Sequence, residues 1–293
     1  MPLPALTWPV IAAVLLGALL HALWNALVKS SDDKPLDTAL VHALAALLAL
    51  PLALAVGLPA AASWPFILAS LLVHVGYYTA LAGAYQHGEL GLTYPIMRGL
   101  APLLTALASA RWLGEAPSVA AWAGIVGITA GVVLVGLAHP GQALHHRKAM
   151  GYALVNAAII AAYTVIDGQG IRRATADGAS ALPYVLWLFA LDGISYPLLV
   201  WLRRGRAGRP ALWAYARRRW PMAALGGCAS IGSYTIALWA MTRAPVASVA
   251  ALREVSVLFA ALLGHHLLRE RFGLQRALGT LVVVAGVMAL RVA

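Results

Sequence analysis

The feature that most constrains this chain is a succession of apolar runs, each about as long as a membrane-spanning helix. Of the 293 residues, 62% are hydrophobic and 11% are charged, whereas soluble domains contain roughly 25% charged residues. Because a spanning helix needs about 20 apolar residues, the chain has room for roughly ten spans and for no sizeable aqueous domain. We predict an all-α integral membrane protein. The expected spans are 6–28, 36–56, 64–86, 91–110, 118–138, 149–167, 181–202, 220–242, 245–265 and 274–291.

The first apolar run, Leu6 to Val28, is long enough to span, and it lacks the basic start and cleavage site of a secretory signal. We therefore count it as the first helix. The one cysteine, Cys228, cannot form an intrachain disulfide, and no Cys/His pair has the spacing of zinc ligands. We expect no metal and no other cofactor.

The second half of the sequence repeats the first. Arg98 and Glu115 recur 155 residues later as Arg253 and Glu270, and glycines of the fifth and tenth spans recur at the same offset. The predicted units are a first repeat at 1–138, a linker at 139–148 and a second repeat at 149–293. With five spans each, the two halves enter the membrane in opposite directions. Inverted repeats are typical of secondary transporters that work by alternating access.

The basic residues are distributed unevenly between the two ends of the spans. The connections 1–2, 3–4, 5–6, 7–8 and 9–10 hold 14 Lys and Arg residues, and the other side holds five, tails included. The positive-inside rule then places both termini outside the cytoplasm. Seven basic residues fall in 203–219, which we expect to be the longest loop. Membrane topology alone explains their charge, and binding of anionic lipid headgroups is the alternative.

Three short motifs accompany this two-times-five plan. His21-Ala22-Leu23-Trp24-Asn25, through Lys29, ends the first span, and Leu113-Gly114-Glu115 and Leu268-Arg269-Glu270 each precede a glycine-rich helix. The chain resembles the EamA-type ten-helix branch of the drug/metabolite transporter superfamily. The resemblance implies an inner-membrane carrier of small metabolites, often an exporter of amino acids, with a cavity lined by spans 1, 3, 4, 6, 8 and 9. Many members keep both termini in the cytoplasm, which is the reverse of the charge-derived orientation.

Polar side chains at membrane depth are costly and are therefore candidates for function. Trp24 and Asn25 share a face of the first span with His21, where the ring can pack on the apolar part of a small zwitterion and the amide can bind its polar end. The alternative is an interhelical hydrogen bond. His74 and Tyr78 belong to an aromatic stripe on the third span that faces either the cavity or a neighbouring helix. The further candidates for substrate binding are Tyr94, Tyr163, Tyr234 and Trp239.

Arg98 and Arg253 are the two arginines expected to lie deepest. A guanidinium stays charged, so each needs an anion or a water-filled cavity. They either clamp a substrate carboxylate or pair with Glu254 or Asp192 to hold helices together. Glu254 and Asp192 are also candidates for proton coupling, as is Asp167.

We expect a secondary transporter, an exporter of small amphipathic metabolites with amino acids as the leading class. A carrier of organic anions and a flippase of lipid-linked substrates remain alternatives. A membrane enzyme is disfavoured, because the chain has no His-Glu-x-x-His, no Gly-x-Ser-x-Gly and no paired membrane aspartates. The expected partners are a small-molecule substrate and membrane lipids, without nucleic acid, and a monomer is compatible with the sequence.

Overall fold

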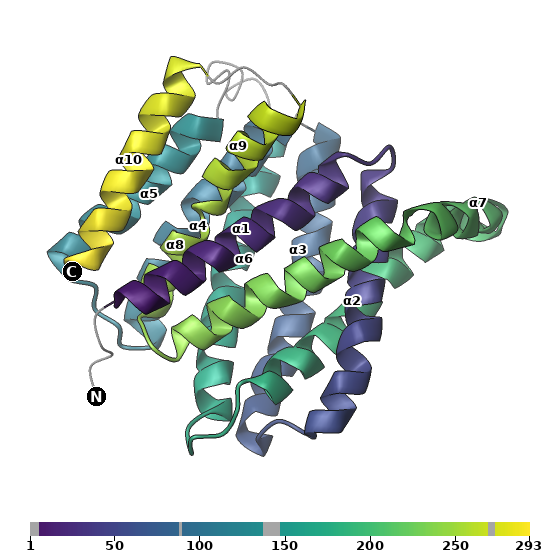
Figure 1. Cartoon of the computed structure of the whole chain (residues 1–293), viewed down its shortest axis with the longest axis horizontal. Coiled ribbons are helices and arrows are strands. Elements are labelled where there is room, and N and C mark those ends of the chain that lie inside the picture. Colours follow the sequence, from purple (N-terminus) through teal and green to yellow (C-terminus); the bar gives the residue numbers. More distant parts are fainter. Residues whose placement is uncertain (1–5, 88–89, 137–146, 269–272) are drawn as a thin grey trace.

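The computed structural model describes residues 6–87, 90–136, 147–268 and 273–293, and these form a bundle of helices without strands (Figure 1). A short 3₁₀ turn, Ala61–Ser63, precedes α3. The helices are α1 (Trp8–Lys29), α2 (Lys34–Val56), α3 (Trp64–His87), α4 (Leu90–Trp112), α5 (Val119–Gly136), α6 (Arg147–Ala174), α7 (Leu182–Met241), α8 (Val246–Arg253), α9 (Ser256–Leu268) and α10 (Leu274–Arg291).

These helices confirm the predicted all-α membrane fold with two inverted five-helix repeats. Among the described residues, eight segments are long and apolar enough to cross a membrane, and Val119–Val135 is a shorter apolar helix. Two predicted spans, 181–202 and 220–242, are the arms of α7. The predicted span 245–265 is α8 followed by α9, with a turn at Glu254 and Val255 between them.

The predicted loop at 203–219 is wrong. The segment is helical and continues both arms of α7, with one kink at Gly205, whose φ of 62° lies in the left-handed region. Glycine adopts that conformation without steric cost, so the chain can turn there within a single residue. The neighbouring Ala, Leu and Arg residues are good helix formers. In Figure 1 this middle part of α7 projects from the bundle.

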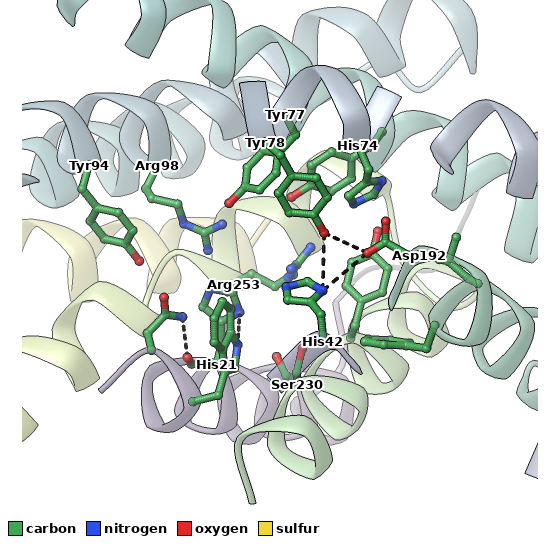
Figure 2. A pocket seen from close by; sticks show the side chains of 17 residues that line it. His21, His42, His74, Tyr77, Tyr78, Tyr94, Arg98, Asp192, Ser230 and Arg253 are labelled. Carbon is green, nitrogen blue, oxygen red and sulfur yellow. Dashed lines mark hydrogen bonds and ion pairs between the residues drawn. The ribbon is translucent and has the colours of Figure 1, made fainter. Parts of the chain in front are cut away.

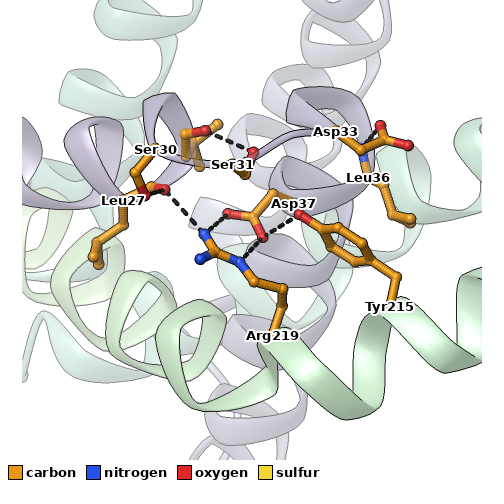
Figure 3. Close-up of polar contacts among 9 residues, drawn as sticks. Leu27, Ser30, Ser31, Asp33, Leu36, Asp37, Tyr215 and Arg219 are labelled. Atoms are coloured by element: carbon orange, nitrogen blue, oxygen red, sulfur yellow. Dashed lines mark hydrogen bonds and ion pairs between the residues drawn. The ribbon is translucent and has the colours of Figure 1, made fainter.

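Part of the basic segment is used to join the two halves (Figure 3). Asp37, which is almost fully buried, accepts hydrogen bonds from Arg219 Nε at 3.1 Å and from Tyr215 OH at 2.9 Å. Arg204 forms an ion pair with Asp33 nearby. These contacts fasten the start of α2 to both arms of α7, on either side of the kink at Gly205.

The side of α2 and α3 that faces outward is apolar. Leu47, Leu54 and Leu72 are 67%, 64% and 75% exposed. Such side chains are costly in water and favourable against lipid tails. Their exposure is therefore what a bilayer-embedded bundle requires.

Glycines bring α5 and α10 into backbone contact. A Cβ atom built on Gly124 would lie 2.8 Å from the carbonyl oxygen of Gly286, and one built on Gly131 would lie 2.8 Å from that of Gly279. The reciprocal distances are 2.8 and 2.9 Å. Because the repeat relates Gly124 to Gly279 and Gly131 to Gly286, the two contacts are equivalent by the internal symmetry. Close helix packing, rather than a ligand site, explains these glycines.

We predict that Gly286→Leu destabilises the protein by roughly 1–3 kcal/mol, the usual cost of overpacking. The carbonyl that blocks the new side chain is backbone and cannot rotate away. The measurement is the thermal unfolding midpoint in detergent. Gly151→Leu is the matched control, because no atom lies within 4 Å of a Cβ at Gly151. Equal effects of the two substitutions would contradict the packing argument.

Candidate functional site

A cavity lies at the centre of the bundle, between the two halves (Figure 2). The empty space within it, including solvent at its open mouth, is about 830 Å³. The cavity is lined by His21, Trp24, Asn25, His42, His74, Tyr77, Tyr78, Tyr94, Arg98, Tyr163, Leu188, Phe189, Asp192, Ser230, Ser233, Tyr234 and Arg253.

Nine of the ten residues predicted to bind substrate line this cavity, and Asp192 lines it as well. The nine are Trp24, Asn25, His74, Tyr78, Tyr94, Arg98, Tyr163, Tyr234 and Arg253. Trp239 does not. It lies at a second hollow, where the Arg243 guanidinium sits 5.5 Å from its ring centroid. Five residues after Tyr234, Trp239 points about 140° around the helix, away from the cavity.

Arg98 takes part in an ion pair between the two halves. Its Nε lies 2.9 Å from Glu254 Oε2, and the two side chains are only 9% and 5% exposed. Arg98 Nη2 is buried and has no hydrogen-bond partner among the described residues. The site therefore combines a structural ion pair with a donor that is available to a ligand.

Arg253 is held differently. Its guanidinium lies 5.0 Å from the ring centroid of Tyr234, a cation–π arrangement. Within the described part of the chain, no carboxylate lies within ion-pair distance of Arg253. Its charge is thus less neutralised than that of Arg98.

The two arginines reach the same depth from opposite ends of the bundle. Arg98 is the ninth residue of α4 and Arg253 is the eighth of α8. The helices begin on opposite sides because the repeats are inverted, and each arginine lies roughly 10–12 Å from the start of its helix. They therefore meet near the middle of the bundle, where inverted-repeat carriers place their substrate sites.

Asp192 lies on the other side of the cavity from Arg98 and Tyr94 (Figure 2). Tyr78 OH donates to Asp192 Oδ2 at 3.0 Å, and His42 Nδ1 lies 3.7 Å from the same oxygen. The sequence reasoning did not select His42. The signal was available, since His42 interrupts an apolar run, but the family resemblance places the second span outside the cavity.

Aromatic rings form much of the remaining wall. The His74 ring stacks on Tyr163 with a centroid distance of 4.5 Å. On α1, Trp24 Nε1 donates to His21 Nδ1 at 3.3 Å and Asn25 Nδ2 donates to the His21 carbonyl at 2.7 Å. These contacts fix the Trp24 ring and the Asn25 amide at the cavity.

Asp167 does not line the cavity but supports it from behind. This fully buried carboxylate accepts hydrogen bonds from Ser70 Oγ at 3.0 Å, Tyr184 OH at 3.0 Å and Tyr234 OH at 2.5 Å. The donors come from α3 and from both arms of α7. Asp167 thereby positions the Tyr234 ring over Arg253.

A charged cluster joins the two halves at the end where α4, α6 and α7 finish. Glu115 Oε1 lies 2.5 Å from Arg172 Nη2, and Glu115 Oε2 accepts from the Val246 amide at 2.9 Å. Gly114, with φ at 68°, makes the turn that places Glu115 there. This geometry accounts for the Leu-Gly-Glu motif. The repeat-related Arg269 and Glu270 lie outside the described residues.

In the described part of the chain, no three His, Cys, Asp or Glu residues are grouped so that they could hold a metal ion. The arrangement suits non-covalent binding of a small charged molecule, because two guanidiniums, a carboxylate and several aromatic rings line one cavity.

Inverted repeats around a central charged cavity define a multi-pass membrane transporter. The chain belongs to the EamA-like transporter family, whose sequence model matches residues 8–137 and 147–292. A solved crystal structure is similar in fold, with a TM-score of 0.72 and 20% sequence identity over 97% of this chain and 95% of that chain. A comparison with curated protein sequences gave no match.

We predict that Arg98→Gln lowers the free energy of unfolding by roughly 3–5 kcal/mol, because it leaves Glu254 buried without its counterion. The double variant Arg98→Gln/Glu254→Gln loses less than the single variant, since neither charge then remains. Unfolding in detergent measures both, with the exposed Arg217→Gln as the control. The single variant Glu254→Gln is measured as well. If the losses of Arg98→Gln and Glu254→Gln simply add in the double variant, the ion pair does not couple the two halves.

Proposed function

We propose that the protein is a secondary transporter that exports small amphipathic metabolites bearing a carboxylate, with amino acids as the leading class, and that it is not an enzyme. The observation that carries the proposal is the pair of arginines in a central cavity between inverted halves. Arg98 Nη2 lacks a partner, and Arg253 lacks a counterion among the described residues. A substrate carboxylate would supply a hydrogen-bond acceptor for Arg98 and a counterion for Arg253.

The rest of the cavity supports an amphipathic substrate. Trp24, Tyr163 and Tyr234 offer aromatic surface beside the arginines. Apolar contact rewards buried area rather than one hydrogen-bond pattern. We therefore expect the carrier to accept apolar side chains of several sizes. Two alternatives remain, a carrier of organic anions, which the same arginines favour, and a flippase of lipid-linked substrates. The uptake experiment below distinguishes both from an amino-acid carrier.

We propose that the two halves, 1–138 and 149–293 with a linker at 139–148, rock about the cavity. The Glu115–Arg172 cluster joins them at one end, and the Asp37–Arg219 cluster joins them at the other. Opening the cavity toward one side would require the cluster on that side to separate. The two carboxylates are 9% and 1% exposed, so water must reach them as the pairs separate, and it can do so when the cavity opens at that end.

Uptake into proteoliposomes tests the function. The panel holds amino acids, their amides, organic anions and lipid-linked sugars, with wild type compared with Arg253→Gln. A charge-assisted hydrogen bond is worth roughly 1.5–3 kcal/mol, so we expect the variant to lose at least about tenfold in affinity for carboxylates and little for amides. Arg217→Gln is the control. Equal losses for acids and amides, or transport of lipid-linked sugars alone, would refute the proposal.

We further propose that the chain lies in the inner membrane with both termini on the non-cytoplasmic side. The support is the excess of Lys and Arg in the connections at the other end of the spans. We expect activity from a reporter that functions only outside the cytoplasm when it is fused after Ala293. A reporter that is active only in the cytoplasm should then be silent, and the opposite pattern would reverse the orientation.

A further inference from the structure

His42, Tyr78 and Asp192 form a cluster on the side of the cavity away from Arg98. They come from α2, α3 and the first arm of α7 (Figure 2). Tyr78 OH lies 3.0 Å from Asp192 Oδ2 and 3.4 Å from His42 Nδ1, and His42 Nδ1 lies 3.7 Å from Asp192 Oδ2. All contacts of the carboxylate within this cluster use one oxygen.

The other oxygen, Asp192 Oδ1, is buried and has no hydrogen-bond partner among the described residues. The Asp192 side chain is 13% exposed, and no Lys or Arg of the described chain lies within ion-pair distance. A carboxylate removed from water without a compensating donor is costly. Two kinds of group can relieve that cost, a proton on Oδ1 or a cationic donor bound to it.

Other ionisable groups surround this carboxylate. His74 lies beside Tyr78 on α3, with a ring centroid distance of 6.4 Å, and Tyr196 of α7 packs on the Tyr78 ring at 4.6 Å. The remaining groups line the cavity from other helices, and these are His21 on α1, Arg98 on α4, Tyr163 on α6, Tyr234 on α7 and Arg253 on α8. Asp192 is the acid that faces the cavity on this side.

We propose that Asp192 binds either a proton or the ammonium group of the substrate, so that the protein exchanges amino acids for protons. The inference rests on the proposed function, and it narrows the substrate class to molecules with an ammonium group as well as a carboxylate. The carboxylate binds at the arginines and the ammonium group at Asp192. Nothing beyond proton transfer and hydrogen bonding is involved.

The two occupants exclude each other for a physical reason. A proton on Oδ1 removes the negative charge and turns that oxygen into a hydroxyl donor, so the group loses the charge-assisted hydrogen bond that would hold an ammonium group there. When the substrate arrives, the proton leaves Oδ1 for water in the compartment that the cavity then faces. On the other side a proton returns to Oδ1 as the substrate departs. One proton moves inward for each amino acid moved outward.

His42 and Tyr78 are positioning residues for this exchange. Tyr78 holds Oδ2, which leaves Oδ1 as the exchanging atom. His42 places an imidazole next to the same carboxylate, where it can accept the proton in transit.

The test uses the whole protein in detergent, with phenylalanine and 3-phenylpropionate as probes, which differ by the ammonium group. We expect about one proton to be released per bound phenylalanine at a pH low enough for Oδ1 to be protonated in the empty cavity, and none on binding of phenylpropionate. Asp192→Asn should release no proton with either probe and should bind phenylpropionate as wild type does, which shows that it is folded. The exposed Asp177→Asn is the control and should behave as wild type.

A transport experiment then distinguishes the proton exchange from the proposed transporter function on which it rests. In proteoliposomes with an acidic lumen, wild type should accumulate phenylalanine at least tenfold over its level at equal pH, and Asp192→Asn less than twofold. Movement of phenylalanine without a response to the pH gradient, or proton release that persists in Asp192→Asn, overturns the exchange and leaves the transporter assignment standing. No movement of either probe overturns the proposed transport of amino acids and other carboxylates.

Discussion

The ion pair between Arg98 and Glu254 is the contact on which the rest of the site depends. It joins α4 of one half to the turn after α8 of the other, at a depth where water cannot compensate either charge. A buried pair gains little net stability over an apolar contact, but losing either partner is costly. The pair therefore specifies how the two halves meet, and it leaves Arg98 Nη2 without a partner among the described residues.

The other charged side chains occupy distinct positions around this pair. Arg98 lies on one side of the cavity and Asp192 with His42 on the other (Figure 2), and Asp167 holds Tyr234 from behind. Ion pairs between the halves also occur at both ends of the bundle, at Glu115 and at Asp37. Each buried charge thus either meets a partner or faces the cavity, as the low-dielectric interior requires.

Sequence reasoning recovered the spans because hydrophobic length is set by the bilayer, and it found Arg98 and Arg253 because the repeat places them at matching positions. The prediction of a loop at 203–219 failed, because it rested on the density of charged residues alone. The basic segment around Arg204 resembled a loop, but it is helical despite Gly208 and Pro210, and only Gly205 leaves the helical conformation. Sequence reasoning missed His42 and misplaced Trp239, because the direction of a side chain depends on helix rotation, which span boundaries do not determine.

The glycine seam between α5 and α10 has a mechanical consequence. At Gly124 with Gly286, and at Gly131 with Gly279, the two backbones touch with no side chain between them. Sliding one helix along the other would drive neighbouring side chains such as Val283 and Leu290 into the opposing backbone, whereas a small change in crossing angle would not. The two contacts are related by the internal symmetry, and each joins a helix of one half to a helix of the other. The seam is therefore suited to act as a hinge, about which the two halves rotate without sliding.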